Sequence, residues 1–209
     1  MKIKNWLGSV ILGAALCTSA ATLAAIDKII VFGDSLSDNG NVYNMLAMAK
    51  NVIPLVPLIP KNPPYYEGRS KQEAYERYFQ TMIDCVKAYD FVDSLGHIDY
   101  IARYAPYADP EIYYHDFSDA IHELLSVVVQ KNIALEINTR RFDDQQVIEH
   151  LLPIYQKFHD LGGKYVTLGS DAHRPTAVAS HLQDAWKLAQ RCGLQAVYYE
   201  ERQRKLMTE

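Results

Sequence analysis

Three side chains of types that commonly bind metal ions follow two segments expected to be strands. His97 comes after residues 91–95, and Asp171 and His173 come after residues 165–168. In a barrel of parallel strands, the loops after the strands converge on one face. Metal-assisted hydrolysis of a phosphate ester needs histidine and carboxylate ligands in such a place. We therefore expect the three side chains to meet in one cleft, although spacing alone leaves metal binding and a solvated or capping role equally open.

A different chemistry is suggested by Ser35 near the N-terminus. The apolar run Ile26–Phe32 favours a buried strand, and the sequence Gly33-Asp34-Ser35 follows it directly. A serine hydroxyl is a weak nucleophile that needs exposure, a neighbouring base and donors for the developing oxyanion. A tight turn after a strand supplies the exposure.

The segments that must position the C-terminal residues alternate between helix and strand. Apolar stripes at helical spacing and short β-branched runs predict them from residue 71 onward. The predicted helices are 71–88, 116–131, 143–161 and 177–192, and the predicted strands are 91–95, 133–137, 165–168 and 194–199. Strands separated by helices favour βαβ units and a parallel α/β sheet. About four such units would make half of a (β/α) barrel.

The first 25 residues carry the features of a secretory signal peptide. Lys2 and Lys4 precede an apolar stretch, Trp6–Leu16, that is too short to span a bilayer, and small residues then offer cleavage sites. We expect export and no stable membrane span after cleavage. Removal of this segment leaves Cys85 and Cys192, and the sequence leaves a disulfide between them open.

Composition and proline content bound the domain organisation. The chain has 209 residues, 49% of them hydrophobic, and a formal net charge of -4, which gives no electrostatic argument for a nucleic-acid partner. Five prolines lie between Pro54 and Pro64 and predict no regular structure there. We expect a signal peptide at 1–25, an N-terminal fragment with its linker at 26–69, and a C-terminal unit at 70–209.

The N-terminal fragment resembles the first block of secreted GDSL (SGNH) esterases and lipases. The resemblance lies in Ile-Val-Phe-Gly-Asp-Ser-Leu-Ser-Asp-Asn-Gly-Asn at 30–41 and Pro-Tyr-Tyr-Glu-Gly-Arg at 64–69. It implies a short βα fragment, with Ser35 as nucleophile and its backbone N–H as an oxyanion donor. The family's later blocks are not found in this sequence. Asp119 and His122 match the spacing of its Asp-His pair but lie inside an amphipathic helix, so we expect an inert serine.

The C-terminal unit resembles the second half of a PHP-family histidinol-phosphatase. The resemblance runs from about Glu67 onward through Leu-Gly-His-Ile-Asp-Tyr-Ile-Ala-Arg-Tyr at 95–104, Ala-Leu-Glu-Ile-Asn-Thr at 134–139 and Val-Thr-Leu-Gly-Ser-Asp-Ala-His at 166–173. It implies a partial (β/α) barrel of PHP type and a cluster of zinc, manganese or iron ions. The implied metal ligands are His97, Asp171 and His173, and Asp171 would also handle a proton. Arg103 would hold the phosphate of a small ester substrate, with help from Arg140 or Arg141.

The family's opening His-x-His motif, its other N-terminal histidines and its bridging glutamate have no counterpart in this sequence. Three ligands would leave three metals under-coordinated, so we expect sub-stoichiometric metal. A half-barrel would also expose unpaired strand edges and favour self-association. We therefore interpret the chain as a hybrid of two proteins. Its signal peptide predicts export, whereas its C-terminal resemblance implies a cytoplasmic location. As an activity, a PHP-type phosphomonoesterase, incomplete or inactive in this hybrid, comes first and a secreted serine esterase comes second. In a test tube we expect a non-catalytic remnant that closes neither fold.

Overall fold

The computed structural model describes residues 63–208, which form one mixed β-sheet with helices packed on it. The strands lie in the order of the chain: β1 (Ser94–Leu95), β2 (Ala134–Asn138), β3 (Tyr165–Gly169), β4 (Gln195–Glu200) and β5 (Gln203–Leu206). The first four run parallel and β5 pairs antiparallel with β4. The predicted α/β fold is therefore confirmed, with an antiparallel strand that we did not predict.

The described part of the chain contains five α-helices. They are α3 (Pro63–Tyr66), α4 (Lys71–Ala88), α5 (Ser118–Gln130), α6 (Gln145–Asp160) and α7 (Leu182–Arg191). Single 3-10 turns lie at Tyr100–Arg103, Tyr114–Asp116 and Pro175–Ala177. None of the described helices is long and apolar enough to span a bilayer.

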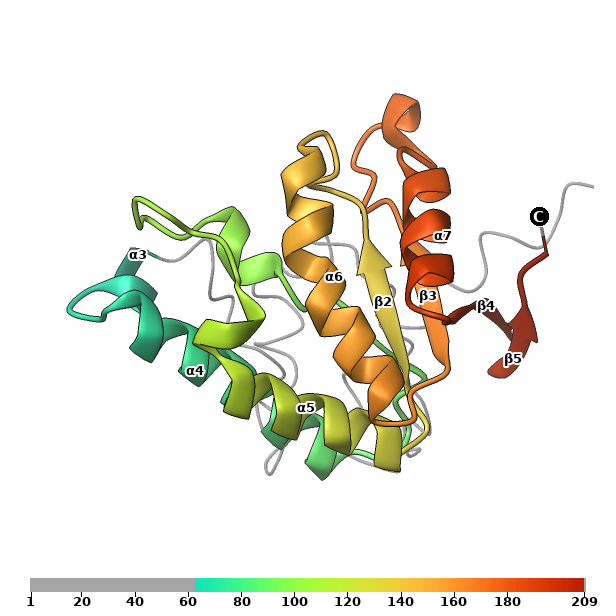
Figure 1. The fold of residues 1–209 in the computed structure, drawn as a ribbon, viewed down its shortest axis with the longest axis horizontal. Coiled ribbons are helices and arrows are strands. Elements are labelled where there is room, and N and C mark those ends of the chain that lie inside the picture. The colour runs from blue at the N-terminus through green and yellow to red at the C-terminus, as the bar shows by residue number, and fades with distance from the viewer. Residues whose placement is uncertain (1–62, 209) are drawn as a thin grey trace, which may run out of the picture.

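The core lies between one face of the sheet and these helices. Leu135, Ile137 and Val166 alternate with polar neighbours along β2 and β3, and all three are fully buried in the apolar cluster. Figure 1 shows α6 and α7 beside β2 and β3, with α5 and α4 packed together below them. Because alternate residues point to opposite faces, the other face carries Glu136, Asn138 and Thr167.

The sequence explains both the start and the packing of α4. Ser70 is its N-cap: the Ser70 hydroxyl accepts the Glu73 N–H at 3.3 Å, and the Glu73 carboxylate accepts the Ser70 N–H at 2.8 Å. This capping box satisfies two backbone donors that the first turn leaves unpaired. The predicted apolar stripe is buried, and the predicted bounds 71–88 are confirmed.

The described structure begins with the last two prolines of the proline-rich stretch, in α3. Our expectation that no regular structure extends through Pro64 is wrong, because proline fits the first turn of a helix, where its missing N–H has no partner to lose. Tyr65 and Tyr66 then join the core: their hydroxyls donate to the carbonyls of Ala74 at 2.7 Å and Ile101 at 3.4 Å. The signal peptide, the Ser35 turn and the rest of the linker lie outside the described residues.

The helix predicted from residue 177 starts later, at Leu182. Ala179 and His181 have φ values of 64° and 57°, so the backbone there is left-handed and cannot continue a right-handed helix. His181 instead joins two segments: its Nε2 lies 2.9 Å from Asp143 Oδ1, and its Nδ1 lies 3.3 Å from Asp184 Oδ2.

A hairpin of β4 and β5 ends the described chain. Its turn residues Glu201 and Arg202 have φ values of 48° and 63°, which non-glycine residues rarely adopt. Arg202 makes a two-point ion pair with Asp93 next to β1, with nitrogen–oxygen distances of 2.9 and 3.0 Å. This contact joins the two ends of the described sheet and offsets the strain of the turn.

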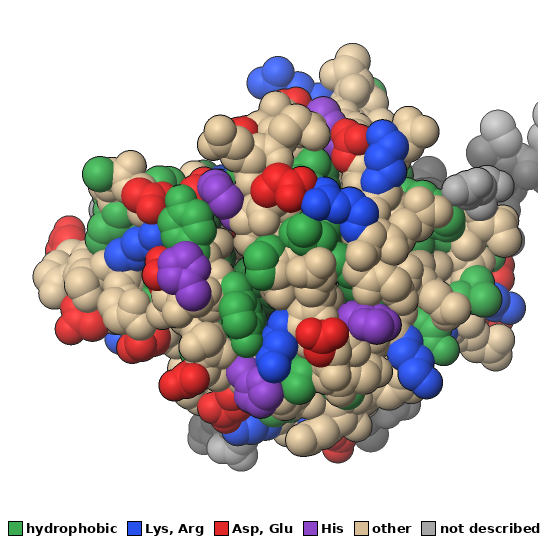
Figure 2. Space-filling model, viewed as in Figure 1, with side chains coloured by type: hydrophobic (Ala, Val, Ile, Leu, Met, Phe, Trp, Pro, Cys, Tyr) green, Lys and Arg blue, Asp and Glu red, His purple; other side chains and the backbone are tan. Residues whose placement is uncertain are grey.

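The surface carries charges of both signs, and the two described cysteines are buried. On the face shown in Figure 2, acidic and basic side chains are interspersed. Arg191 on α7 pairs with Glu149 on α6 at 2.7 Å. Cys85 and Cys192 are buried thiols that form no disulfide with each other, and burial raises the pKa of Cys192 to about 11. Self-association through strand edges stays a prediction.

Replacing Glu201 by glycine should stabilise the protein. Glycine adopts a positive φ without the steric cost that Glu201 bears, so we expect the free energy of unfolding to rise by about 0.5–1 kcal/mol. The control is Glu200→Gly in strand β4, which should lower it by about the same amount. Urea denaturation measures both, and an equal or lower stability for Glu201→Gly would contradict the strained-turn interpretation.

The His181 contacts should make stability depend on pH. Hydrogen bonds to Asp143 and then Asp184 raise the pKa of His181 above its ordinary value of 6.5. A raised pKa stabilises the folded state fully below the unfolded-state pKa, and this contribution is lost as pH rises through the folded-state pKa. The difference in unfolding free energy between wild type and His181→Asn should therefore be larger at pH 5.5 than at pH 8.5. Asparagine tolerates the left-handed backbone, so a pH-independent difference would refute the charged pairing.

Candidate active site

The candidate residues lie where the parallel strands end. His97 follows β1, Glu136 and Asn138 lie on β2, and Asp171 follows β3. Asn138 pairs in register with Gly169, and the Thr139 N–H donates to the Gly169 carbonyl at 2.8 Å. The predicted convergence of loops at this edge thus has a direct cause in the strand pairing.

Two of the predicted site residues have strained backbones. His97 has a φ of 61° and Asp171 a φ of 49°, so both are left-handed without being glycine. Such conformations cost about 1–2 kcal/mol and persist where the surroundings enforce them, often at functional sites. For His97 the enforcing contacts are visible: its N–H donates to Glu136 Oε2 at 3.0 Å, and its carbonyl accepts the Tyr78 hydroxyl at 2.5 Å.

Asp171 is the most enclosed charged group of the site. Its side chain has no exposed area, and its Oδ2 lies 2.7 Å from Arg103 Nη1. Its Oδ1 is buried and has no hydrogen-bond partner among the described residues; His173 Nδ1 lies 3.6 Å away. His173 Nδ1 is also 2.8 Å from the Asp171 carbonyl. A buried carboxylate oxygen without a donor, beside an imidazole, is suited to a cation.

Arg103 reaches Asp171 from the 3-10 turn after β1. Its guanidinium carbon lies 5.6 Å from the ring centre of Tyr100 and 5.2 Å from that of Tyr104. Cation–π contacts of this kind hold a guanidinium in one orientation. The structure thus brings together Arg103, Asp171 and His173.

His97 belongs to a neighbouring group of contacts. Its Nδ1 lies 3.4 Å from Asn138 Nδ2, and its ring is 5.1 Å from that of Tyr100. Among residues 63–208, no group of three or more His, Cys, Asp or Glu side chains is placed to hold a metal ion. Joint ligation by His97, Asp171 and His173 therefore stays a prediction.

The two arginines after β2 differ in their surroundings. Arg141 is mostly buried: its Nη1 lies 3.3 Å from Asp99 Oδ2, and its Nη2 contacts Glu111. Burial raises the pKa of Asp99, and the nearby Arg141 opposes this effect. Arg140 is exposed, and its backbone N–H donates to Asn138 Oδ1 at 3.0 Å. Of the two, Arg140 is the one that a phosphate could reach without breaking an ion pair.

The sequence analysis gave Glu136 and Asn138 no role. Glu136 is enclosed between neighbouring strands, and this burial raises its pKa, while His97 and Asn138 counteract part of the rise. A signal was available, because Glu136 and Asn138 alternate with the buried Leu135 and Ile137. A carboxylate at such a position in a central strand is unusual enough to indicate a polar contact on the opposite face.

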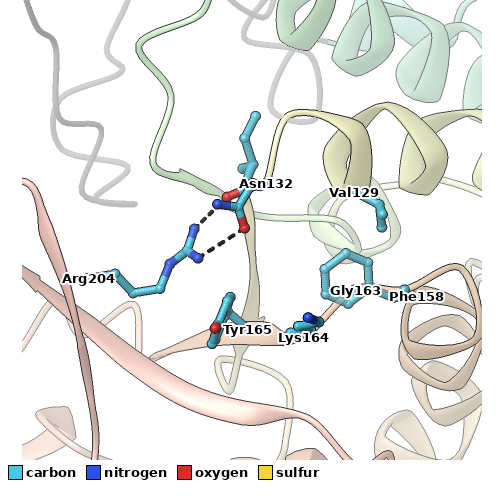
Figure 3. A pocket seen from close by; sticks show the side chains of 9 residues that line it. Val129, Asn132, Phe158, Gly163, Lys164, Tyr165 and Arg204 are labelled. Atoms are coloured by element: carbon cyan, nitrogen blue, oxygen red, sulfur yellow. Dashed lines mark hydrogen bonds between the residues drawn. The ribbon is translucent and has the colours of Figure 1, made fainter.

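A cavity of about 380 Å³ lies at the opposite ends of the strands (Figure 3). Asn132 and Tyr165 lie at its wall, near the starts of β2 and β3. Arg204 lies 4.2 Å from the Tyr165 ring centre and donates to Asn132 Oδ1 at 3.1 Å. In (β/α) barrels, the face before the strands serves stability and the face after them carries the active site. The cavity is thus separate from the candidate site.

Known proteins resemble most of the described chain. The family description "PHP domain" matches residues 41–140. The probable histidinol-phosphatase of Clostridium acetobutylicum is 45% identical over 137 residues, which make up 66% of this chain and 54% of that protein. The crystal structure of histidinol phosphate phosphatase from Lactococcus lactis, complexed with zinc, L-histidinol and phosphate, matches with a TM-score of 0.60 and 29% identity, over 68% of this chain and 54% of that one.

A shorter match is to a different kind of enzyme. The phosphatidylcholine-sterol acyltransferase of Aeromonas hydrophila is 37% identical over 68 residues, which make up 32% of this chain and 18% of that protein. The chain spans about half the length of the histidinol-phosphatases that it matches. About two thirds of the chain is thus similar to histidinol-phosphatases, and residues 41–140 match the PHP-domain description.

Proposed function

We propose that this chain carries part of the active site of a metal-dependent phosphomonoesterase that hydrolyses a small phosphate ester, as a histidinol-phosphatase does. The observation that carries the proposal is the enclosed Asp171, which pairs with Arg103 through one oxygen and leaves the other without a hydrogen bond among the described residues. A buried carboxylate oxygen with no hydrogen bond is costly in an ion pair that serves stability alone. The arrangement suits an aspartate that shares its charge between an arginine and a cation.

Asp171 and His173 are the residues that would hold a divalent ion, with His97 as the third ligand. Zinc, manganese and iron all accept such oxygen and imidazole donors. A bound ion would polarise a phosphoryl oxygen and lower the pKa of water. The zinc in the Lactococcus lactis relative supports this assignment. With these ligands alone we expect at most one weakly held ion per chain.

Arg103 would bind the substrate phosphate. Its ion pair with Asp171 uses one terminal nitrogen, and its side chain is 16% exposed. The planar guanidinium offers further N–H groups that match two phosphate oxygens at once. Arg140 is an exposed second cation for the same anion. In the same proposal, the Asp171 carboxylate would accept a proton from the attacking water and pass it to the leaving alcohol oxygen as the phosphate ester bond breaks.

Asp171→Asn should separate this function from a structural role. The amide has the same shape but lacks the charge, so the dissociation constant for zinc should rise at least tenfold, and chelator-sensitive release of phosphate from histidinol phosphate should disappear. Zinc titration against a chromogenic chelator and a phosphate assay measure the two effects. The control is Asp160→Asn, at an exposed site at the end of α6, which should change neither.

Two results would count against the proposal. If wild type and Asp171→Asn bind zinc equally, Asp171 is not a ligand. If the wild-type chain holds three ions tightly by elemental analysis, the expectation of an incomplete metal site is wrong.

A serine esterase is the second candidate, with Ser35 as nucleophile. The match to an acyltransferase favours it, because acyl transfer from an ester uses the same nucleophilic chemistry. We also propose that the chain is a hybrid of two parts, an N-terminal fragment at residues 26–69 and a C-terminal unit at residues 70–209. Export by the signal peptide and a cytoplasmic location, which the C-terminal resemblance implies, stay alternative proposals for the localisation of the protein.

Ser35 should not react with a fluorophosphonate probe, because we find no base for it in the sequence. The measurement is gel fluorescence of the purified chain after labelling, with Ser35→Ala and Ser37→Ala as paired variants. Labelling that disappears in Ser35→Ala and persists in Ser37→Ala would make the esterase the leading function.

A further inference from the structure

The carboxylate of Glu136 occupies a gap that two glycines leave open. Gly96 directly follows β1, and Gly169 is the last residue of β3. Strands β1 and β3 lie on either side of β2. A β-carbon at Gly96 would lie 2.9 Å from Glu136 Oε2, and one at Gly169 would lie 2.3 Å from Glu136 Oε1. Neither glycine has a positive φ, so space for the carboxylate, and not backbone conformation, requires them.

This carboxylate contacts the strained residue directly. Glu136 Oε2 accepts the His97 N–H at 3.0 Å and the Asn138 side-chain amide at 3.4 Å. The Arg140 N–H donates to Asn138 Oδ1, which fixes the amide so that its nitrogen faces both Glu136 and His97. The Tyr155 hydroxyl donates to the Glu136 carbonyl at 2.7 Å and holds the strand beneath.

His97 is thereby fixed from two sides. Glu136 takes its N–H, and the Tyr78 hydroxyl donates to its carbonyl. Hydrogen bonds to a charged acceptor are stronger than neutral ones, so the carboxylate can hold a backbone conformation that is uncommon for residues other than glycine.

We propose that Glu136 is a positioning residue, whose carboxylate, seated between Gly96 and Gly169, holds His97 in its left-handed conformation and so aims the His97 ring at the edge where Asp171 lies. The inference that this orientation of His97 serves metal binding rests on the proposed function. The positioning itself does not depend on it. Burial of the Glu136 carboxylate costs free energy, but an apolar side chain at this place would leave the His97 N–H without an acceptor.

The test uses the full chain with three variants. Glu136→Leu removes the acceptor and keeps the bulk. Glu136→Gln keeps an oxygen acceptor in the same place. Glu149→Leu is the matched control, at an exposed carboxylate on α6. One readout is hydrogen exchange of the His97 amide by NMR, and the other is the zinc dissociation constant.

We expect the His97 amide to exchange at least tenfold faster in Glu136→Leu, with a zinc dissociation constant about 10–100-fold higher, as for loss of other groups that orient ligands. Glu136→Gln should stay within about threefold of wild type, and Glu149→Leu should match wild type. A purely structural role would lower stability without changing His97 exchange selectively.

The outcomes separate the two proposals. If wild type binds no zinc, the proposed function fails, and His97 exchange alone decides the role of Glu136. If Glu136→Leu folds and leaves His97 exchange unchanged, the positioning role is wrong. If it does not fold, Gly169→Ala replaces it: the added methyl overlaps the carboxylate and should speed His97 exchange, and unchanged exchange there also overturns the proposal.

Discussion

The enclosed carboxylates at the ends of β2 and β3 are the constraint on which the rest of the site depends. A charge taken out of water must be matched by donors or by an opposite charge, otherwise it destabilises the fold. Asp171 meets this demand only in part, through Arg103. Glu136 meets it through a backbone N–H and an amide. The first arrangement leaves an oxygen for a ligand, and the second uses the carboxylate to shape its neighbour.

The left-handed backbones at this edge of the sheet are consistent with these two roles of the carboxylates. His97 and Asp171 both have left-handed backbones, which are uncommon for residues other than glycine. The sheet and helices supply the rigidity that holds them: β2 lies between β1 and β3, and its apolar face is anchored in the core by Leu135 and Ile137. A well-packed support of this kind lets the polar face keep strained and charged groups in place.

The last hairpin shows the same exchange of local cost for a distant contact. The turn at Glu201 and Arg202 lacks the Asn-Gly or Gly-Gly sequence that such turns favour. Arg202 instead reaches Asp93 beside the first strand, and the Tyr199 hydroxyl donates to the Asp93 carbonyl at 2.8 Å. The β4–β5 end of the described chain is thus fastened to the start of the sheet by side chains far apart in sequence.

The sequence by itself determined the local elements. The capping box at Ser70 and Glu73 and the stripe behind it set α4 to the residue, and the apolar runs of β2 to β4 were placed within about a residue, because hydrophobic period and capping are local signals. It also pointed to His97, Asp171 and His173 through their places after strands, and to Arg103 through the resemblance to histidinol-phosphatases. The tertiary structure alone decided that Arg103 faces Asp171, that Arg141 is engaged with Asp99 and Glu111, and that Glu136 lies between two glycines. These contacts join residues 30 to 68 positions apart, or depend on which face of a strand meets which neighbour, and no local pattern encodes such separations.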